Sequence, residues 1–462
     1  MTTPSACRAT PRPLAAAAAA LAAVSLAGLS TPALAADAPP AIDTGDTSWM
    51  LVSTALVLMM TIPGLALFYA GMVRRKNVLA TLMQSFAICC IITVVWMVAG
   101  YSLAFGTGTP YIGDLSRFML NGIGAHIAKG ADIGFTMGAG TPNAVTMTIP
   151  ESIWMMFQMT FAIITPALIA GAFAERMKFS ALCVFTVLWS LIVYAPVAHW
   201  VWSPLGWVAG LGAIDFAGGT VVHINAGIAG LVTALVLGKR VGYGQDDLSP
   251  FNLTYAVIGA SLLWVGWFGF NAGSAVGANG RAGMAMATTQ IAAAAAGVGW
   301  MLAEWARTGK PTVLGIISGA VGGLVAITPA AGFILPGSAL IIGLAAGVIC
   351  YWSATSLKHL LGYDDSLDAF GVHGIGGIVG ALLTGVFAYG PLSATDANPG
   401  GVVGSFAQFV TQAEAVGVTI VWCGIVTFVL LKLVDLTIGL RVSRDDEQEG
   451  LDMTQHGERI NI

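Results

Sequence analysis

Charged side chains are scarce in this 462-residue chain, since Asp, Glu, Lys and Arg together make up 9% of it. Soluble domains average about a quarter. Hydrophobic residues account for 56% of the chain, and the mean hydropathy is +0.82. A soluble fold of this size needs a polar surface, and too few polar residues are present to form one. The composition therefore excludes a soluble protein and predicts an integral membrane protein.

Cysteine is also sparse, and its six positions form no C-x-x-C or Cys/His pattern. Five of the six fall within apolar runs, where a free cysteine packs as a small hydrophobic residue. The formal net charge of −4 provides no basic surface for nucleic acid. We therefore expect no disulfide framework, no metal site and no nucleic-acid partner.

The first 35 residues are predicted to be a signal peptide. Arg8 and Arg12 precede an Ala/Leu run at 14–29, and Ala33-Leu34-Ala35 matches a small-x-small cleavage site. Removal of 1–35 would also remove Cys7 and leave a mature chain that begins outside the membrane.

Windows of about twenty apolar residues predict eleven transmembrane helices. We place them near 49–71, 78–105, 152–173, 179–201, 219–238, 254–273, 284–305, 312–333, 335–358, 369–390 and 413–438. The expected fold is therefore an all-α, multi-pass membrane domain over 36–440, followed by a tail at 441–462.

Basic residues fall mainly in alternate connections, which predicts the orientation. One side carries Arg74, Arg75, Lys76, Arg176, Lys178, Lys239, Arg240, Arg307, Lys310, Lys358, Arg441 and Arg444. The other side carries only Arg117, Lys129 and Arg281. The positive-inside rule places the first set in the cytoplasm, the mature N-terminus outside and the tail inside the plasma (inner) membrane.

Two distant stretches place a histidine at the same point of a similar apolar segment. In 215–230 and 365–380, an Asp lies eight residues before His223 or His373, and glycines lie four and seven residues after it. The motif Ile-Thr-Pro-Ala at 164–167 also recurs at 327–330, five predicted spans later. A five-span unit has odd parity, so the second copy must be inverted in the membrane.

The inverted halves are expected at about 49–238 and 254–390, with the helix near 413–438 outside the repeat. Such repeats place a substrate site near the bilayer midplane, at the interface between the halves. Asp215 and Asp365 stand at helix N-cap positions, where a carboxylate accepts backbone N–H groups. Direct or field-mediated attraction of a cation is the alternative role of Asp215.

Titratable rings within hydrocarbon are functional candidates. A neutral imidazole donates at one nitrogen and accepts at the other, so two facing rings can serve a small polar guest that loses its charge before entry. One alternative is a core histidine bonded to a carbonyl. Another is haem ligation, which an absorption spectrum would reveal; no companion redox motif is present, and we expect no cofactor.

Four motifs resemble the ammonium transporter (Amt/Mep/Rh) family, on its bacterial Amt branch. They are MTIPGLALFYAGMVRRKN at 60–77, DFAGGTVVHINAG at 215–227, GWFGFNAGS at 266–274 and FGVHG at 370–374. The resemblance runs in order from about Trp49 to Gly457. It implies an eleven-helix fold with an inverted five-helix repeat and a homotrimer with one pore per subunit.

The resemblance also implies an external recruitment site formed by Phe157, Phe161, Trp202 and Ser274. An ammonium ion over an aromatic face gains ~0.5–2 kcal/mol, and a serine hydroxyl adds an acceptor. By the same resemblance, Phe161 and Phe270 form a gate and Trp267 forms a pore wall beside the histidines. The loop at 202–207 is a residue longer than the family pattern, so Trp207 competes with Trp202 for this role.

The energetics favour loss of the proton before transit. A charge at the bilayer centre costs at least about 2.5–3.5 kcal/mol, and ammonium in a dry tunnel should suffer similarly. We therefore expect ammonium to be recruited outside and deprotonated near the phenyl gate, and ammonia to pass His223 and His373. Potassium cannot shed its charge and is disfavoured, and no enzymatic activity is expected.

The acidic tail at 441–458 has two interpretations. Its composition is typical of a solvated or disordered end. The resemblance instead implies docking of a PII-type nitrogen signalling protein, because Glu449–Asp452 and His456–Glu458 match the tail through which family members meet these partners. An ammonium sensor is the main rival to a transporter, and a sensor is expected to carry an appended signalling domain.

Overall fold

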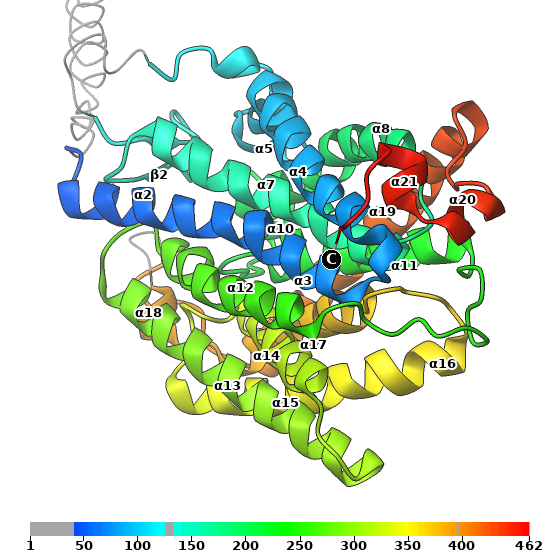
Figure 1. Cartoon of the computed structure of the whole chain (residues 1–462). Coiled ribbons are helices and arrows are strands. Elements are labelled where there is room, and N and C mark those ends of the chain that lie inside the picture. Colours follow the sequence, from blue (N-terminus) through cyan, green and yellow to red (C-terminus); the bar gives the residue numbers. More distant parts are fainter. Residues whose placement is uncertain (1–40, 125–132, 142, 395–397, 462) are drawn as a thin grey trace, which may run out of the picture. The chain divides into compact units, whose positions relative to one another are not determined.

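The computed structural model describes residues 41–124, 133–141, 143–394 and 398–461, and these are mostly helical. The predicted signal peptide at 1–35 lies outside the described residues. Within them, ten helices are long and apolar enough to cross a membrane. Figure 1 shows the long helices packed side by side. The chain is thus an all-helical, multi-pass membrane protein.

The helices of the first predicted half follow the expected spans closely. They cover Thr44–Met72 (α2, Thr44–Met59; α3, Ala66–Met72), Arg75–Phe105 (α4, Val78–Val95; α5, Tyr101–Phe105), Glu151–Phe173 (α7), Phe179–Gly210 (α8, Phe179–Trp189; α9, Ala195–Trp202; α10, Trp207–Gly210) and Gly219–Leu237 (ending in α11, Asn225–Leu237). Two short antiparallel strands, Thr136–Met137 (β1) and Val145–Thr146 (β2), lie in the segment before α7.

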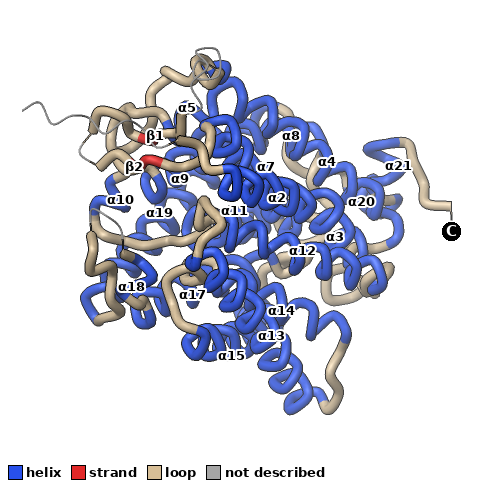
Figure 2. Tube along the Cα trace, turned by 90° about the vertical axis from the view of Figure 1, so that its left-hand side faces the viewer, coloured by secondary structure: helices blue, strands red, loops and turns tan. Residues whose placement is uncertain are grey.

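The second half and the tail complete the bundle. Their helices are Leu253–Gly273 (α12), Gly280–Thr308 (α13), Val313–Ile327 (α14), Pro336–Leu361 (α15, Pro336–Trp352; α16, Lys358–Leu361), Phe370–Phe387 (ending in α17, Ile375–Phe387), Gly390–Ser393 (α18), Phe406–Thr437 (α19), Arg444–Glu449 (α20) and Leu451–His456 (α21). Figure 2 shows the two strands at the opposite end of the bundle from α20 and α21.

The segment predicted as a span at 312–333 forms a shorter helix. α14 has 15 residues, and at 1.5 Å per residue it is roughly 22 Å long, less than the ~30 Å of a hydrocarbon core. Pro329 follows its end, and proline has no N–H with which to continue the helical ladder. Among the described residues, ten helices therefore satisfy the length expected of a span, and α14 is a shorter apolar helix that accompanies them.

The tail folds back onto the helical bundle. The Asp452 carboxylate accepts a hydrogen bond from the Ala80 N–H at 2.8 Å, and the Asn77 side chain accepts one from the Leu451 N–H at 2.8 Å. Val442 and Leu451 are buried against Ala80. The solvated-end interpretation is therefore wrong for this segment, because its apolar and capping side chains find partners on Asn77 and on the first turn of α4.

A buried ion-pair network lies near the docked tail. Glu175 contacts Arg74 at 2.9 Å and Arg240 at 3.3 Å, and Arg240 contacts Asp364 at 2.9 Å. Burial alone would raise the pKa of Glu175 and of Asp364, but the neighbouring guanidinium groups outweigh burial and lower both pKa values. These arginines were predicted only as loop cations, because charge pairing between distant loops leaves no local sequence signal.

Candidate functional site

The two histidines identified from the repeat come together in space. His223 lies in a π-helical turn, Gly219–Ile224, that continues into α11. His373 lies in a corresponding turn, Phe370–Gly374, that continues into α17. Their ring centroids are 5.4 Å apart with planes inclined by 19°, and the residues are 1% and 3% exposed. The predicted halves thus each place one buried imidazole in the same stack.

Two aspartates hold the starts of these turns. The Asp215 carboxylate accepts hydrogen bonds from the N–H groups of Gly218 at 2.8 Å and Gly219 at 2.6 Å. The Asp365 carboxylate accepts them from Ala369 at 3.1 Å and Phe370 at 2.7 Å. Each carboxylate therefore satisfies backbone donors that a helix start leaves unpaired.

The glycine four residues after each histidine lets the two helices cross closely. A Cβ added to Gly227 would lie 2.2 Å from the Gly374 backbone nitrogen. A Cβ added to Gly377 would lie 3.1 Å from the Gly219 carbonyl oxygen and 3.1 Å from the His223 Cβ. Side chains at these positions would push the histidine-bearing segments apart. The repeated glycines therefore allow the backbone approach that stacks the rings.

The ring nitrogens of this pair are largely unpartnered. Among the described residues, three of these ring nitrogens have no hydrogen-bond partner: Nδ1 and Nε2 of His223 and Nδ1 of His373. Buried polar atoms are normally satisfied, so these atoms are available to a guest. His199 shows the contrasting arrangement, since its Nδ1 and Nε2 lie 2.9 and 2.7 Å from the carbonyl oxygens of Ala104 and Thr109. The core-histidine alternative thus describes His199, which the sequence reasoning did not single out.

Aromatic side chains flank the histidine stack on one side. The ring of Trp267 lies 5.4 Å from that of His223, and the ring of Phe270 lies 5.9 Å from it. The Trp267 indole N–H donates to the Thr328 hydroxyl at 2.9 Å, which fixes the ring. The surroundings of His223 are therefore apolar.

Phe161 and Phe270 form the next layer beyond His223. Their ring centroids are 4.2 Å apart, and the residues are 1% and 0% exposed. Phe161 also packs edge-on against Phe157 at 4.9 Å and against Trp202 at 5.7 Å. The rings therefore form one series from Trp202 through Phe161 and Phe270 to the histidines.

Two polar groups accompany this series of rings, the indole N–H of Trp202 and the hydroxyl of Ser274. The Trp202 indole N–H donates to the Asp215 carbonyl at 3.1 Å, and the Ser274 hydroxyl donates to the Phe270 carbonyl at 2.8 Å. Because its hydrogen is used in this bond, the Ser274 oxygen can still accept one from a guest. Trp207 packs against Tyr111 and Trp200 instead. Of the two competing tryptophans, Trp202 is the one in contact with Phe161.

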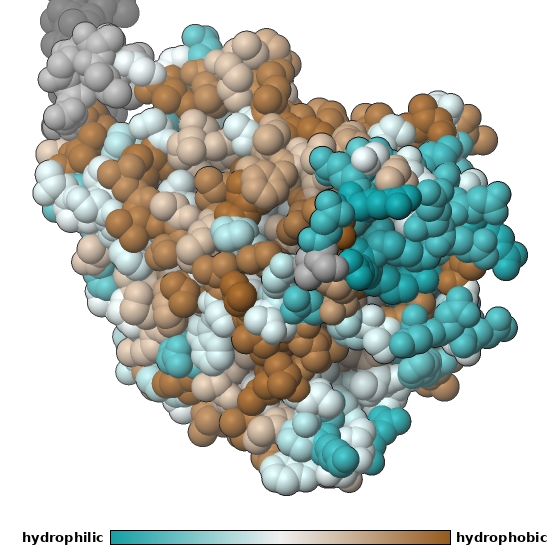
Figure 3. Space-filling view, viewed as in Figure 1, coloured by the Kyte–Doolittle hydropathy of each residue, from teal (hydrophilic) through white to brown (hydrophobic). Residues whose placement is uncertain are grey.

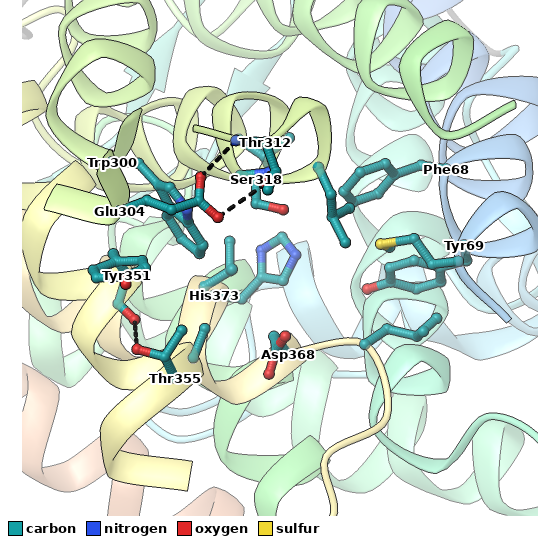
Figure 4. A pocket seen from close by; sticks show the side chains of 17 residues that line it. Phe68, Tyr69, Trp300, Glu304, Thr312, Ser318, Tyr351, Thr355, Asp368 and His373 are labelled. Atoms are coloured by element: carbon teal, nitrogen blue, oxygen red, sulfur yellow. Dashed lines mark hydrogen bonds between the residues drawn. The ribbon is translucent and has the colours of Figure 1, made fainter. Parts of the chain in front are cut away.

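A pocket opens on the other side of the stack, where His373 forms part of the wall. The cavity measures roughly 190 Å³, and Figure 4 shows the His373 imidazole in the middle of the view, with aromatic, hydroxyl and carboxylate side chains of the lining around it. Glu304, which the sequence reasoning missed, accepts hydrogen bonds there from the N–H of Thr312 at 3.0 Å and from its hydroxyl at 2.9 Å. Its position depends on the packing of α13 against α14, so no local motif predicts it.

The chemistry that this arrangement allows is binding and transfer of a small guest. Among the described residues, no three His, Cys, Asp or Glu side chains are placed to hold a metal ion. The series instead combines cation-attracting aromatic faces, a closed phenyl pair and two imidazoles in an apolar setting. A small ion that can lose a proton fits these properties.

Known ammonium transporters resemble this chain over most of its length. The chain is 50% identical over 415 residues to an ammonium transporter of Bacillus subtilis (strain 168), covering 90% of this chain and 98% of that one. It is 49% identical over 418 residues to an ammonium transporter of Aquifex aeolicus (strain VF5), covering 90% of this chain and 93% of that one.

Solved structures and a family model agree with these relatives. The crystal structure of Saccharomyces cerevisiae Mep2 matches with a TM-score of 0.78 at 36% identity, covering 87% of this chain and 88% of that chain. A structure described as a sensor Amt protein matches with a TM-score of 0.78 at 28% identity, covering 89% and 98%. The model of the Ammonium Transporter Family matches residues 48–460. The resemblance inferred from the sequence motifs is confirmed, and the chain belongs to the ammonium transporter family.

Proposed function

We propose that this protein recruits ammonium at Phe157, Phe161, Trp202 and Ser274, removes a proton beside the Phe161–Phe270 gate, and conducts ammonia past His223 and His373. The observation that carries the proposal is the pair of buried, stacked imidazoles with unpartnered ring nitrogens. Such nitrogens are costly unless a guest uses them.

The order of the steps follows from charge. Ammonium gains cation–π attraction only at the aromatic faces of the outer site. Beyond the phenyl pair, an ion would lose its hydration without a fixed counter-charge in the stack, at a cost of at least about 2.5–3.5 kcal/mol. Ammonia avoids this cost and can exchange hydrogen bonds with the imidazoles. Potassium has no neutral form and is excluded.

The membrane arrangement forms part of the same proposal. Halves near 49–238 and 254–390 form an inverted repeat, the helix near 413–438 is the eleventh of the domain at 36–440, and the protein assembles as a homotrimer in the plasma (inner) membrane. Residues 1–35 act as the signal peptide, and the tail at 441–462 is cytoplasmic. This orientation is supported by the basic loops and the docked tail, which share one end of the bundle.

The docked tail supports a PII-type partner at that end. Its exposed acidic residues and the lysines of the predicted cytoplasmic loops, Lys178, Lys239 and Lys310, would be presented three times by a trimer, which favours a multivalent partner. A second candidate function is ammonium sensing through this partner, favoured by the likeness to the sensor Amt structure. Coupled transport and PII-capture measurements separate the two roles.

The decisive experiment replaces His223 with Ala and measures current and ammonium uptake together in proteoliposomes. We expect His223→Ala to lose discrimination between ammonium and potassium, because the shortened side chain leaves a more hydrated tunnel. His359→Ala is the matched control, since His359 is exposed on α16. A His223→Ala protein that still moves ammonium and excludes potassium as the parent does would refute the paired-imidazole mechanism.

A further inference from the structure

A second cavity lies at the end of the bundle where α11 and α19 finish. It measures roughly 530 Å³ and is lined by residues of 239–245, directly after α11, and of 441–447, at the start of the tail. Figure 3 shows hydrophilic residues gathered over this end of the molecule, around α20 and α21. The cavity is separate from the histidine stack and takes no part in the proposed conduction.

Cations predominate in its lining. Lys239, Arg240, Arg441 and Arg444 line it, against the single carboxylate of Glu447. The other acidic residues of the second segment, Asp445 and Asp446, are not part of the lining, and neither is Asp246, which directly follows the first segment. An anion inside the cavity would therefore meet a positive field.

Two of the four cations are already paired, because Arg240 contacts Asp364 and Glu175, and Arg441 holds the two walls together. Arg441 donates to the carbonyls of Leu237 at 2.8 Å and Lys239 at 2.7 Å and pairs with Glu447 at 2.8 Å. Glu447 in turn accepts a hydrogen bond from the Val241 N–H at 2.6 Å. The cavity therefore exists only while the tail is docked against the loop after α11.

The other two cations are free to bind a ligand. Lys239 and Arg444 are exposed and form no ion pair with any described carboxylate. The ammonium group of Lys239 lies 5.4 Å from the Tyr243 ring centroid, at the edge of the cavity. A guanidinium and an ammonium on opposite segments suit the oxygens of a phosphate group.

The cavity also borders the apolar part of the molecule. Lys239 lies two residues after the last residue of α11, and Arg441 lies four residues after the last residue of α19. In the final turns of these helices, Leu235, Leu433 and Leu436 are 60%, 51% and 84% exposed. Acyl chains could cover these leucines while a headgroup occupies the cavity, since basic pockets at the ends of membrane helices attract anionic headgroups.

We propose that this cavity binds the phosphate group of an anionic phospholipid through Lys239 and Arg444, and that the bound lipid stabilises the docked tail. The coupling follows from mass action, because a ligand that binds only the docked form shifts the equilibrium toward it. A free phosphate ion has the same recognised chemistry without the acyl chains, and the test separates the two sources.

The test titrates delipidated, purified protein with phosphatidylglycerol, with phosphatidylcholine of the same acyl chains and with inorganic phosphate, and measures binding by native mass spectrometry. The double variant Lys239→Gln/Arg444→Gln should bind phosphatidylglycerol about tenfold more weakly, since each basic residue near a membrane contributes to anionic lipid binding. The matched control Arg307→Gln/Lys310→Gln removes the same charge from another loop and should bind as the parent does. The charge-conserving Lys239→Arg/Arg444→Lys variant should retain binding.

Hydrogen exchange of 441–456 provides a second measurement. Phosphatidylglycerol should slow exchange there in the parent and not in the Lys239→Gln/Arg444→Gln variant. Equal phosphatidylglycerol binding by parent and variant would overturn the site, as would equal binding of phosphatidylcholine. Phosphate binding with the same dependence on the variant, and no preference for the lipid, would overturn the lipid as the ligand. Unchanged exchange in the tail would overturn the coupling.

Discussion

Replacing Gly227 with Ala tests whether the close crossing of the two histidine-bearing helices sets the pore. The new Cβ would lie 2.2 Å from the Gly374 nitrogen, and ordinary contact begins at 3.4 Å. The obstructing atoms belong to the backbone, so no side-chain rotation relieves the clash. The helices must therefore separate locally by about 3.4 − 2.2 = 1.2 Å.

Both stability and transport should fall. Overpacking of this kind costs about 1–3 kcal/mol, partly offset by the higher helix propensity of alanine, worth up to about 1 kcal/mol. A displacement of about 1 Å in a preorganised site can reduce its rate by up to roughly 100-fold. We therefore expect ammonium uptake in proteoliposomes to drop about 10- to 100-fold while the purified protein remains folded, with a lowered Tm.

Gly424→Ala is the matched control on the neighbouring helix α19. Its added Cβ would lie 3.7 Å from Ile228 Cγ2, an ordinary contact. This variant should keep the parent's uptake, and its Tm should equal or exceed that of the parent, because the alanine meets no clash and favours the helix. Parental uptake and Tm in Gly227→Ala would refute the argument that the glycine crossing positions the rings.

Three further perturbations probe other parts of the structure. Trp202→Ala should raise the half-saturating ammonium concentration about 2- to 30-fold, corresponding to the loss of ~0.5–2 kcal/mol of cation–π attraction, with little change in maximal uptake; an equal shift in Trp207→Ala would contradict the assignment of Trp202. Asp364→Asn should destabilise the protein by about 3–5 kcal/mol at neutral pH, because Arg240 loses a buried partner. The pKa of Asp364 is lowered in the folded protein. Its ionised carboxylate therefore contributes fully to the free energy of unfolding above the unfolded pKa of about 3.9, and this contribution is lost as the pH falls through the lower folded pKa. The Tm values of parent and variant should therefore converge in acid, and a difference that persisted there would contradict the argument. Deleting 445–458 should abolish capture of a PII protein from cell extract and leave the trimer intact, as pull-down and size measurements would show; undiminished capture would reject the tail as a docking element.

Much of the fold could be predicted because the membrane imposes a local rule. A span needs about twenty consecutive apolar residues, so the segment predicted at 152–173 became Glu151–Phe173 and the one at 254–273 became Leu253–Gly273. The histidine repeat and the family motifs are likewise continuous stretches. Properties that depend only on consecutive residues can be inferred without knowing which helices are neighbours.

Other features depend on which distant residues meet. Composition could not show that α14 ends before Pro329, nor could loop charge show that Arg240 pairs with Asp364 across 124 positions. The choice between Trp202 and Trp207 likewise required the position of Phe161.

The sequence by itself determined a multi-pass helical protein of the ammonium transporter family with two equivalent histidines. The tertiary structure decided that their rings stack 5.4 Å apart, that the tail docks, and that a basic cavity forms between 239–245 and 441–447. The physical reason is that apolar burial along a span is a property of consecutive residues. Ring stacking, ion pairing, tail docking and cavity formation instead depend on contacts between segments far apart in the chain, as for Asp364 and Arg240 at 124 positions and Leu451 and Asn77 at 374.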